Sequence, residues 1–552
     1  MHRRMIVISA IALVLVAIFL TGSGVGSSAT VARHARLGIP AGLADAIHAR
    51  FGARAIRSRS TASPWLDTDL GLAVALSADG TTALVGAPGV ASRKGAAYIF
   101  HASDAGSWSS SGKPVATLTK NHGSSGDEFG TAVALSADGT TAFVGAPTAG
   151  TKFRGAIYVF HASAEDAWAS SSTPAATLTA SFDSYDLYLG ESLALSPDGT
   201  TLVVGAPFYS DEGEAFVFHV ASEDAWVSTS TPTATLSNSA VTEDGRGVGR
   251  SVAISADGTT ALVSDDENPD GGEAYVYHVS AADAWTSSST PTAILSDPDS
   301  NADAYFDYFG NALALSGDGT LAVIASLGAD SNAGAVHVFH ASGEAAWAST
   351  STPTATLTDA TVAWGPGGDE DLEDYFVRVA VSADGTSVLV LAPGVNTTRG
   401  AAYIFHASSE GAWASSSTPT ATLTRSGGHT GDFLGVGMLS PDGATALIGA
   451  HGVRSGTGAA YIFHVSDATS WVSNSIPNAT LTNDALAACV VPKLKGLKLR
   501  AAGFKLLLGR CDRGKVTRVY STPRHRGRVL SQNRKPGKRL AIGAKVGVRV
   551  GK

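Results

Sequence analysis

The chain repeats one pattern of apolar and polar positions. In "TAVALSADGTTAFVGA", apolar residues alternate with small or polar residues on both sides of Asp138-Gly139. Asp-Gly between two such runs is the strongest short-range signal for a β-hairpin, with a type I′ turn that has positive φ at both central residues. The runs "AIYVFHA" and "AATLTA" follow in the same copy. The pattern therefore predicts four short antiparallel strands in each copy.

The Asp-Gly pair returns seven times, at intervals of 58 to 66 residues, and begins at Asp79, Asp138, Asp198, Asp257, Asp318, Asp384 and Asp442. A fixed period of this length indicates an array of one supersecondary unit. Four short strands cannot bury both faces of a sheet alone, so neighbouring sheets must stack. We therefore predict an all-β fold, a seven-bladed β-propeller of four-stranded antiparallel blades. Each copy holds four strands, and no spare strand precedes the first copy.

A second sequence motif recurs in every copy and contains a His, a Trp seven residues later and a Pro six residues after the Trp. It runs from His101, Trp108 and Pro114 in the first copy to His464, Trp471 and Pro477 in the last. Proline removes a ladder donor, so its strand is predicted to be a sheet edge. The seven His residues end third strands of different blades and cannot converge on one metal ion. We interpret the Trp residues as packing between outer strands; exposed sugar-binding shelves are the alternative.

In the second copy, Phe129-Gly130 is followed by Gly145-Ala146-Pro147. These motifs resemble the FG-GAP repeat, the propeller unit of integrin α-subunits and of many bacterial surface proteins, and the resemblance extends over residues 63–486. Copy four departs from it with Ser264-Asp265-Asp266 in place of Gly-Ala-Pro. Many members of the family carry a calcium loop between the first two strands, and this loop is shortened here to Ser-Ala-Asp-Gly or a close variant. One carboxylate cannot supply the six to eight oxygens that calcium takes, so this loop predicts no calcium site.

Acidic residues gather in loops on the face opposite the Asp-Gly turns. Two loops place carboxylates and amides at alternate positions, as calcium loops do, although neither has a Glu at the closing position. The calcium candidates are Asp266, Asn268, Asp270, Asp297, Asp299, Asn301 and Asp303. Solvated acidic loops are the alternative. No catalytic motif appears, but a carboxylate pair of the glycosidase type, for example involving Asp297 or Asp371, stays open.

The two ends of the chain have different compositions. A basic start, an apolar run over 6–20 and small residues before Ala29 predict a signal peptide, residues 1–29, with an uncleaved membrane anchor as the alternative. Residues 30–62 are predicted to be a linker with one short helix. Export favours a disulfide between Cys489 and Cys511. It also places the protein outside the cell or at the cell wall.

Residues 487–552 form a basic segment. From Cys489 onward it holds 19 Lys and Arg residues and one acid, Asp512, whereas residues 63–488 hold 12 basic and 46 acidic residues. We predict a first strand, a helix from Lys498 to Leu508, and strands in "GKVTRVYS", "GRVLSQ" and "AKVGVRV". This α+β segment resembles a PASTA domain, which implies association with peptidoglycan or a related wall polymer. Its charge also suits any polyanion, but two aromatics are too few for base stacking, so no nucleic-acid partner is expected.

Three functions fit these features. The first is a secreted or cell-surface binding or adhesion protein, with the propeller as a platform for a protein or glycan and the basic tail as a wall attachment module. The second is an extracellular enzyme that acts on polysaccharide through the acidic loops. The third is a purely architectural protein. We expect the first, with no catalytic residue and no firm cofactor.

Overall fold

The computed structural model describes residues 68–552 apart from eleven short gaps, at 182–186, 209–212, 241–246, 267–270, 297–307, 329–332, 365–376, 487, 509–510, 523–524 and 542–543. The expectations for the signal peptide and linker lie outside the described residues. Among the described residues, no helix is long and apolar enough to cross a membrane.

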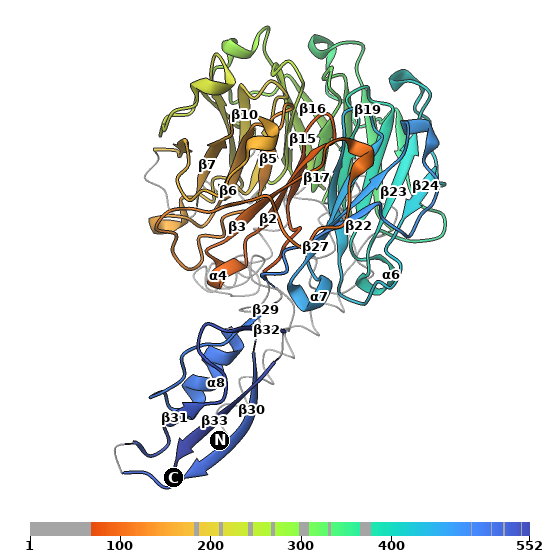
Figure 1. Cartoon of the computed structure of the whole chain (residues 1–552). Helices are drawn as coiled ribbons and strands as arrows, with labels where there is room; N and C mark the ends of the chain where they lie inside the picture. The colour runs from red at the N-terminus through yellow and green to blue at the C-terminus, as the bar shows by residue number, and fades with distance from the viewer. Residues whose placement is uncertain are drawn as a thin grey trace, which may run out of the picture. The chain divides into compact units, whose positions relative to one another are not determined.

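Seven four-stranded antiparallel sheets follow one another along the chain, each with its strands in sequence order (Figure 1). Blades 1 to 3 are β1 Val74–Leu76, β2 Thr82–Ala87, β3 Ala96–His101, β4 Ala116–Leu118; β5 Val133–Leu135, β6 Thr141–Ala146, β7 Ala156–His161, β8 Ala176–Leu178; β9 Ser192–Leu195, β10 Thr201–Ala206, β11 Glu214–His219, β12 Ala234–Leu236. Blades 4 and 5 are β13 Val252–Ile254, β14 Thr260–Asp265, β15 Glu273–His278, β16 Ala293–Ser296; β17 Ala312–Leu315, β18 Leu321–Ser326, β19 Ala335–His340, β20 Ala355–Leu357. Blades 6 and 7 are β21 Arg378–Val381, β22 Ser387–Ala392, β23 Ala401–His406, β24 Ala421–Leu423; β25 Leu434–Leu439, β26 Thr445–Ala450, β27 Ala459–His464, β28 Ala479–Leu481.

The sheets form a closed ring. The first strand of each blade contacts the first strand of the next, and β25 of blade 7 contacts β1 of blade 1. One apolar cluster packs Leu447 and Ile462 of blade 7 against Val85 and Tyr98 of blade 1. The second strand of every blade is buried along its whole length, because both faces of each sheet are covered by neighbours. The predicted seven-bladed propeller is the observed architecture.

The ring closes without a blade that combines strands from the two ends of the propeller. At the junction of blades 7 and 1, Leu70 bridges Gly458 and Ser111 bridges Leu481. The same pair of bridges joins blade 1 to blade 2, where Gly95 meets Phe129 and Leu118 meets Ser171. Each copy therefore forms one whole blade, and the last junction is built like the others.

The Phe-Gly and Gly-Ala-Pro motifs of neighbouring blades pack against each other at these junctions. The backbone of Gly86, from the first Gly-Ala-Pro, lies against the backbone of Gly130, from the second Phe-Gly. A Cβ added at Gly86 would collide with the carbonyl oxygen of Gly130, and Gly130 itself has a φ of +97°. Gly145 meets Gly190 in the same way at the next junction. Glycine is required there because two backbones approach without room for a side chain.

The Asp-Gly hairpins are present in all seven blades, but the predicted type I′ turn is wrong. Only the glycine has positive φ, as at Gly80 (72°), and Asp79 does not. The amide of Gly80 donates to the carbonyl of Ser77 at 3.0 Å, and the amide of Ser77 donates to the carbonyl of Thr82 at 2.9 Å. This is a longer turn that ends on a left-handed glycine. Hydrogen bonds to the Asp79 carboxylate favour it over the two-residue turn.

The C-terminal segment folds around its own small core. Its elements are β29 Ala488–Val490, α8 Leu499–Leu508, β30 Asp512–Val519, β31 Val529–Gln532, β32 Arg539–Ala541 and β33 Lys545–Gly551 (Figure 1). The helix begins within one residue of its predicted start. Ala502 and Leu506 are buried while Lys505 is exposed, as the helical spacing predicts. Strand β33 lies between β30, which is parallel to it, and β31, which is antiparallel.

Candidate functional site

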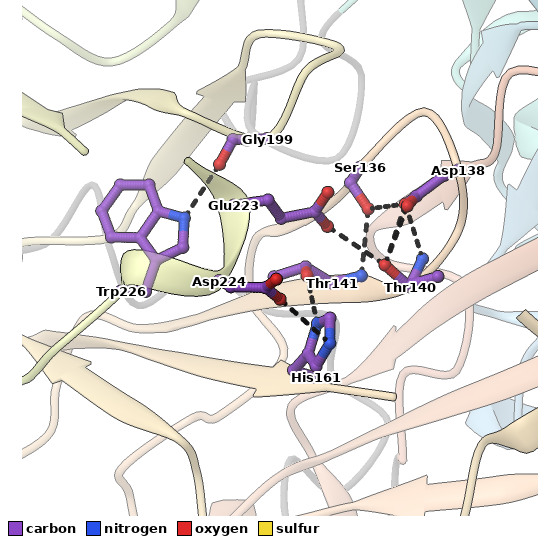
Figure 2. Close-up of polar contacts among 9 residues, drawn as sticks. All are labelled: Ser136, Asp138, Thr140, Thr141, His161, Gly199, Glu223, Asp224 and Trp226. Atoms are coloured by element: carbon purple, nitrogen blue, oxygen red, sulfur yellow. Dashed lines mark hydrogen bonds and ion pairs between the residues drawn. The ribbon is translucent and has the colours of Figure 1, made fainter. Parts of the chain in front are cut away.

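The repeated polar residues join neighbouring blades on the face that carries the Asp-Gly turns, here called the Asp-Gly face. Figure 2 shows this network between blades 2 and 3. The carboxylate of Asp138 accepts hydrogen bonds from Ser136 Oγ at 2.7 Å and from the Thr140 amide at 3.0 Å. The amide of Thr141 donates to Ser136 Oγ, and Thr141 Oγ1 lies 2.8 Å from His161 Nδ1.

These contacts tune the acidity of the turn aspartates. Partial burial acts to raise the pKa of Asp138, but hydrogen bonds from Ser136 and Thr140 outweigh burial and hold the pKa below its ordinary value. The pKa is lowered in the same way at Asp79, Asp257, Asp318 and Asp384. The turn carboxylates are therefore structural acceptors.

The repeated histidines and tryptophans have structural partners of their own. In six blades the His Nδ1 atom lies 2.8–3.0 Å from a Thr or Ser hydroxyl of the second strand. Every repeated Trp is buried and donates from Nε1 to the glycine carbonyl of its own Asp-Gly turn; for Trp226 and Gly199 the distance is 2.8 Å. Among the described residues, no group of three or more His, Cys, Asp or Glu side chains is placed to hold a metal ion. The buried Trp residues leave no sugar-binding shelves.

The serine two positions after each Trp covers the outer edge of the preceding blade. Ser170 Oγ of blade 2 accepts the Thr117 amide of strand β4 in blade 1 at 3.0 Å. The same contact occurs at all seven junctions, including Ser110 with Thr480 where the ring closes. The fourth strand is the sheet edge, as the Pro predicts, and its neighbour protects it from pairing with other chains.

A glutamate three positions before the Trp adds a second link at three junctions. Glu165, Glu223 and Glu344 accept hydrogen bonds from threonines in the Asp-Gly turn of the preceding blade, at 2.8–3.2 Å. In blade 6, burial raises the pKa of Glu410, and Asp318 of blade 5 lies close enough to add to the rise. Blades 1, 4 and 7 have Ala105, Ala282 and Ala468 at this position. The Asp-Gly face is thus occupied by contacts that hold the ring together.

The opposite face carries the loops between strands two and three and the junctions between blades, and we call it the loop face. Its chemistry differs from blade to blade. Ion pairs join Arg93 to Glu128 and Lys120 to Asp127 at the junction of blades 1 and 2, and Arg425 with Asp432 repeats the second of these pairs at the junction of blades 6 and 7. At the junction of blades 2 and 3, the rings of Phe153 and Tyr188 stack instead. This variation makes the loop face the candidate binding surface.

The departure of blade 4 from Gly-Ala-Pro produces a buried polar group on the loop face. Asp266 is 3% exposed, and its Oδ1 atom accepts from Arg250 Nε at 3.1 Å. Burial raises the pKa of Asp266, and Arg250 opposes the rise. The hydroxyl of Tyr275 lies 2.8 Å from Asp265 Oδ2 and 2.9 Å from Glu273 Oε2. The Tyr275 hydroxyl has one proton, so it cannot donate to both carboxylates at once.

The structure describes only a part of the predicted calcium loops. Asp266 is the one candidate among the described residues, and it pairs with Arg250. Asn268, Asp270, Asp297, Asp299, Asn301 and Asp303 lie outside the described residues, as does Asp371 of the hypothetical catalytic pair. Calcium binding by these loops stays a prediction.

The C-terminal segment exposes its charge. Every described Lys and Arg from Lys493 to Lys552 is exposed, and none of these side chains forms an ion pair with another described residue. Cys511 is buried. The side chain of Cys489 lies outside those described, so the pairing of the two stays a prediction.

Comparisons with known proteins agree with the repeat. The family model of the FG-GAP repeat matches residues 113–160, and this match together with the closed ring supports a β-propeller protein. No curated protein matches the chain.

Similar solved structures include Saccharomyces cerevisiae Sqt1, with 10% identity, a TM-score of 0.42, and coverage of 76% of this chain and 86% of that chain. The Myceliophteria thermophila Cps50 (Swd1) β-propeller domain has 13% identity, a TM-score of 0.42, and coverage of 71% and 96%. U3-55K has 11% identity, a TM-score of 0.41, and coverage of 70% and 88%. The assignment of this fold rests on strand pairing and ring closure.

Proposed function

We propose that this protein is a secreted or cell-surface bacterial binding protein. The propeller is a platform for a protein or glycan ligand. Residues 487–552, a PASTA-like module tied by a Cys489–Cys511 disulfide, attach the protein to peptidoglycan or another anionic wall polymer. The function is binding, and the proposal assigns no catalytic residue.

The exposed charge of the C-terminal segment is the observation that carries the proposal. Its Lys and Arg side chains project from a small folded core, and Lys493, Lys495 and Lys498 among them directly precede helix α8. Exposed cationic side chains without acidic partners attract polyanions and raise the rate at which these associate with the protein. Wall polymers that carry phosphate or carboxylate groups match this chemistry.

The difference between the contacts on the two propeller faces supports the role of the propeller as a binding platform. Contacts that repeat from blade to blade occupy the Asp-Gly face, whereas the loop face carries ion pairs, aromatic contacts and buried acids that differ between blades. Loops held by a rigid scaffold are where binding residues concentrate.

Co-sedimentation of the full chain with purified cell walls tests the proposal. We expect the chain to pellet at low salt and a Lys493→Glu/Lys495→Glu/Lys498→Glu variant to stay in the supernatant. High salt should weaken binding, because exposed charges are screened beyond about 10 Å at 0.1 M ionic strength. Lys113→Glu, at an exposed position of the propeller, is the control and should pellet like the wild type. Equal pelleting of the triple variant would remove the attachment role.

A further inference from the structure

Three aromatic rings and an arginine form a row on the loop face across blades 2 to 4, which we call the aromatic row. The rings of Phe153 and Tyr188 are stacked, with centroids 6.0 Å apart and an interplanar angle of 12°. Tyr188 meets Phe208 edge to face at 5.2 Å. The guanidinium of Arg250 lies 5.8 Å from the centre of the Phe208 ring. Phe153 is 48% exposed, so the row opens to solvent at that end.

The fold does not require aromatic residues at these positions. At the preceding junction the equivalent positions are Arg93 and Glu128, which form an ion pair. The backbone is the same in both places, with φ values of 62° and 56° for Arg93 and Glu128 and of 49° and 50° for Phe153 and Tyr188. A charged pair therefore satisfies this loop geometry. Replacing it with a stacked aromatic pair leaves the large apolar side chain of Phe153 exposed to solvent, and a binding role accounts for this exposure.

A buried charged pair lies at the other end of the row. Arg250, which covers Phe208, pairs through Nε with Asp266 Oδ1. Asp266 is almost fully buried, and its Oδ2 atom has no hydrogen-bond partner among the described residues. Asp266 therefore anchors the guanidinium of Arg250 beside Phe208, and the Arg250 side chain keeps 18% of its surface exposed to a ligand.

We propose that the aromatic row is a saccharide-binding site, an inference that rests on the proposed binding function and names its ligand class. A sugar ring presents an apolar C–H face, which packs on the exposed ring of Phe153 and the half-buried ring of Tyr188, and a rim of hydroxyls, which accept hydrogen bonds from a guanidinium such as that of Arg250. Charged groups interrupt the apolar surface around the row, among them Lys152 beside Phe153. These charges favour a ligand that carries hydroxyl groups over an apolar peptide segment.

The matched test variant is Phe153→Arg/Tyr188→Glu, which installs the ion pair of the preceding junction and removes the aromatic surface. Binding of the full chain to neutral hexose and N-acetylhexosamine oligosaccharides is measured by calorimetry and saturation-transfer NMR. We expect the wild type to bind at least one oligosaccharide and the double variant to lose about tenfold or more in affinity, equivalent to about 1.4 kcal/mol. Val227→Ser, at a 68% exposed apolar position next to Trp226, is the control and should bind normally. Thermal unfolding verifies that both variants fold.

Each contrary outcome has a distinct meaning. Oligosaccharide binding that the double variant retains would overturn the aromatic row and leave the glycan platform standing. A wild type that binds none of the oligosaccharides but pellets with cell walls would overturn the saccharide assignment and leave the proposed function standing. A wild type that binds neither would overturn both.

Discussion

If the glutamate link between blades stabilises the ring, removing it at one junction and adding it at another should change the stability in opposite directions. Glu223→Ala removes the carboxylate that accepts from Thr140 of the preceding blade at 3.2 Å. Ala282→Glu supplies the missing group at the next junction, where Thr200 occupies the position of Thr140. A Cβ at Gly258 would lie 3.3 Å from Ala282 Cβ and 2.8 Å from Thr201 Oγ1, so the new side chain begins close to its intended partners.

The expected magnitudes are small and opposite in sign. One hydrogen bond contributes about 0.5–1.5 kcal/mol net. Because Glu223 is half-buried and Thr140 also donates to Asp138, we expect a loss of about 1 kcal/mol for Glu223→Ala. For Ala282→Glu we expect a gain of about 0.5 kcal/mol, since a long side chain must be ordered. The changes involve different junctions, so the double variant should lie near the sum of the two.

Thermal unfolding and native-state hydrogen exchange of the full chain measure the two effects. One kcal/mol moves the Tm of a domain of 150–250 residues by about 2–4 °C, and by less in a larger one. Exchange should therefore be followed locally, at the amides of Thr140 and Thr141 for Glu223→Ala. Unchanged exchange there, together with destabilisation by Ala282→Glu, would refute the stabilising role of the link.

Further predictions concern the repeat and its acids. Gly86→Ala should destabilise the junction of blades 1 and 2 by about 1–3 kcal/mol, as measured by denaturant unfolding, because its Cβ meets the Gly130 carbonyl; near-normal stability would contradict the close approach. Ser170→Ala should speed exchange of the Thr117 amide, its partner at 3.0 Å, and leave the equivalent Thr177 amide unchanged; equal rates in mutant and wild type would count against edge capping. The turn aspartates with lowered pKa contribute stability that is present above the unfolded pKa of about 4 and is lost as the pH falls through the lower folded values. Unfolding midpoints should therefore drop on acidification below about pH 4, and Asp138→Asn should show a smaller drop.

The hydrophobic pattern predicted the architecture because each blade is local in sequence. The Asp-Gly hairpins and the His-ended third strands appear where alternating apolar runs place them. The turn type was wrong because Asp79 is held by Ser77 and Thr81, a side-chain effect that a turn dipeptide does not reveal. Helix α8 was predicted nearly to its ends, since Ala502 and Leu506 mark its buried face.

The contacts between blades could not be predicted from one copy at a time. Ser170 covers Thr117, and Glu223 reaches Thr140, only because neighbouring sheets stack in a particular register. The recurrence of Glu three positions before Trp was a signal that could have located the link. The aromatic row was missed because Phe153 and Tyr188 stand out only when they are aligned with Arg93 and Glu128.

Hydrogen-exchange mapping of the full chain, with and without solubilised cell-wall polymer, tests the central claim most directly. We predict slower exchange over residues 150–155 and 187–191 of the loop face and over the basic segment 493–500, with no change over the Asp-Gly turn at 137–141. Protection of the Asp-Gly turns without protection of the loop face or the basic segment would contradict the account.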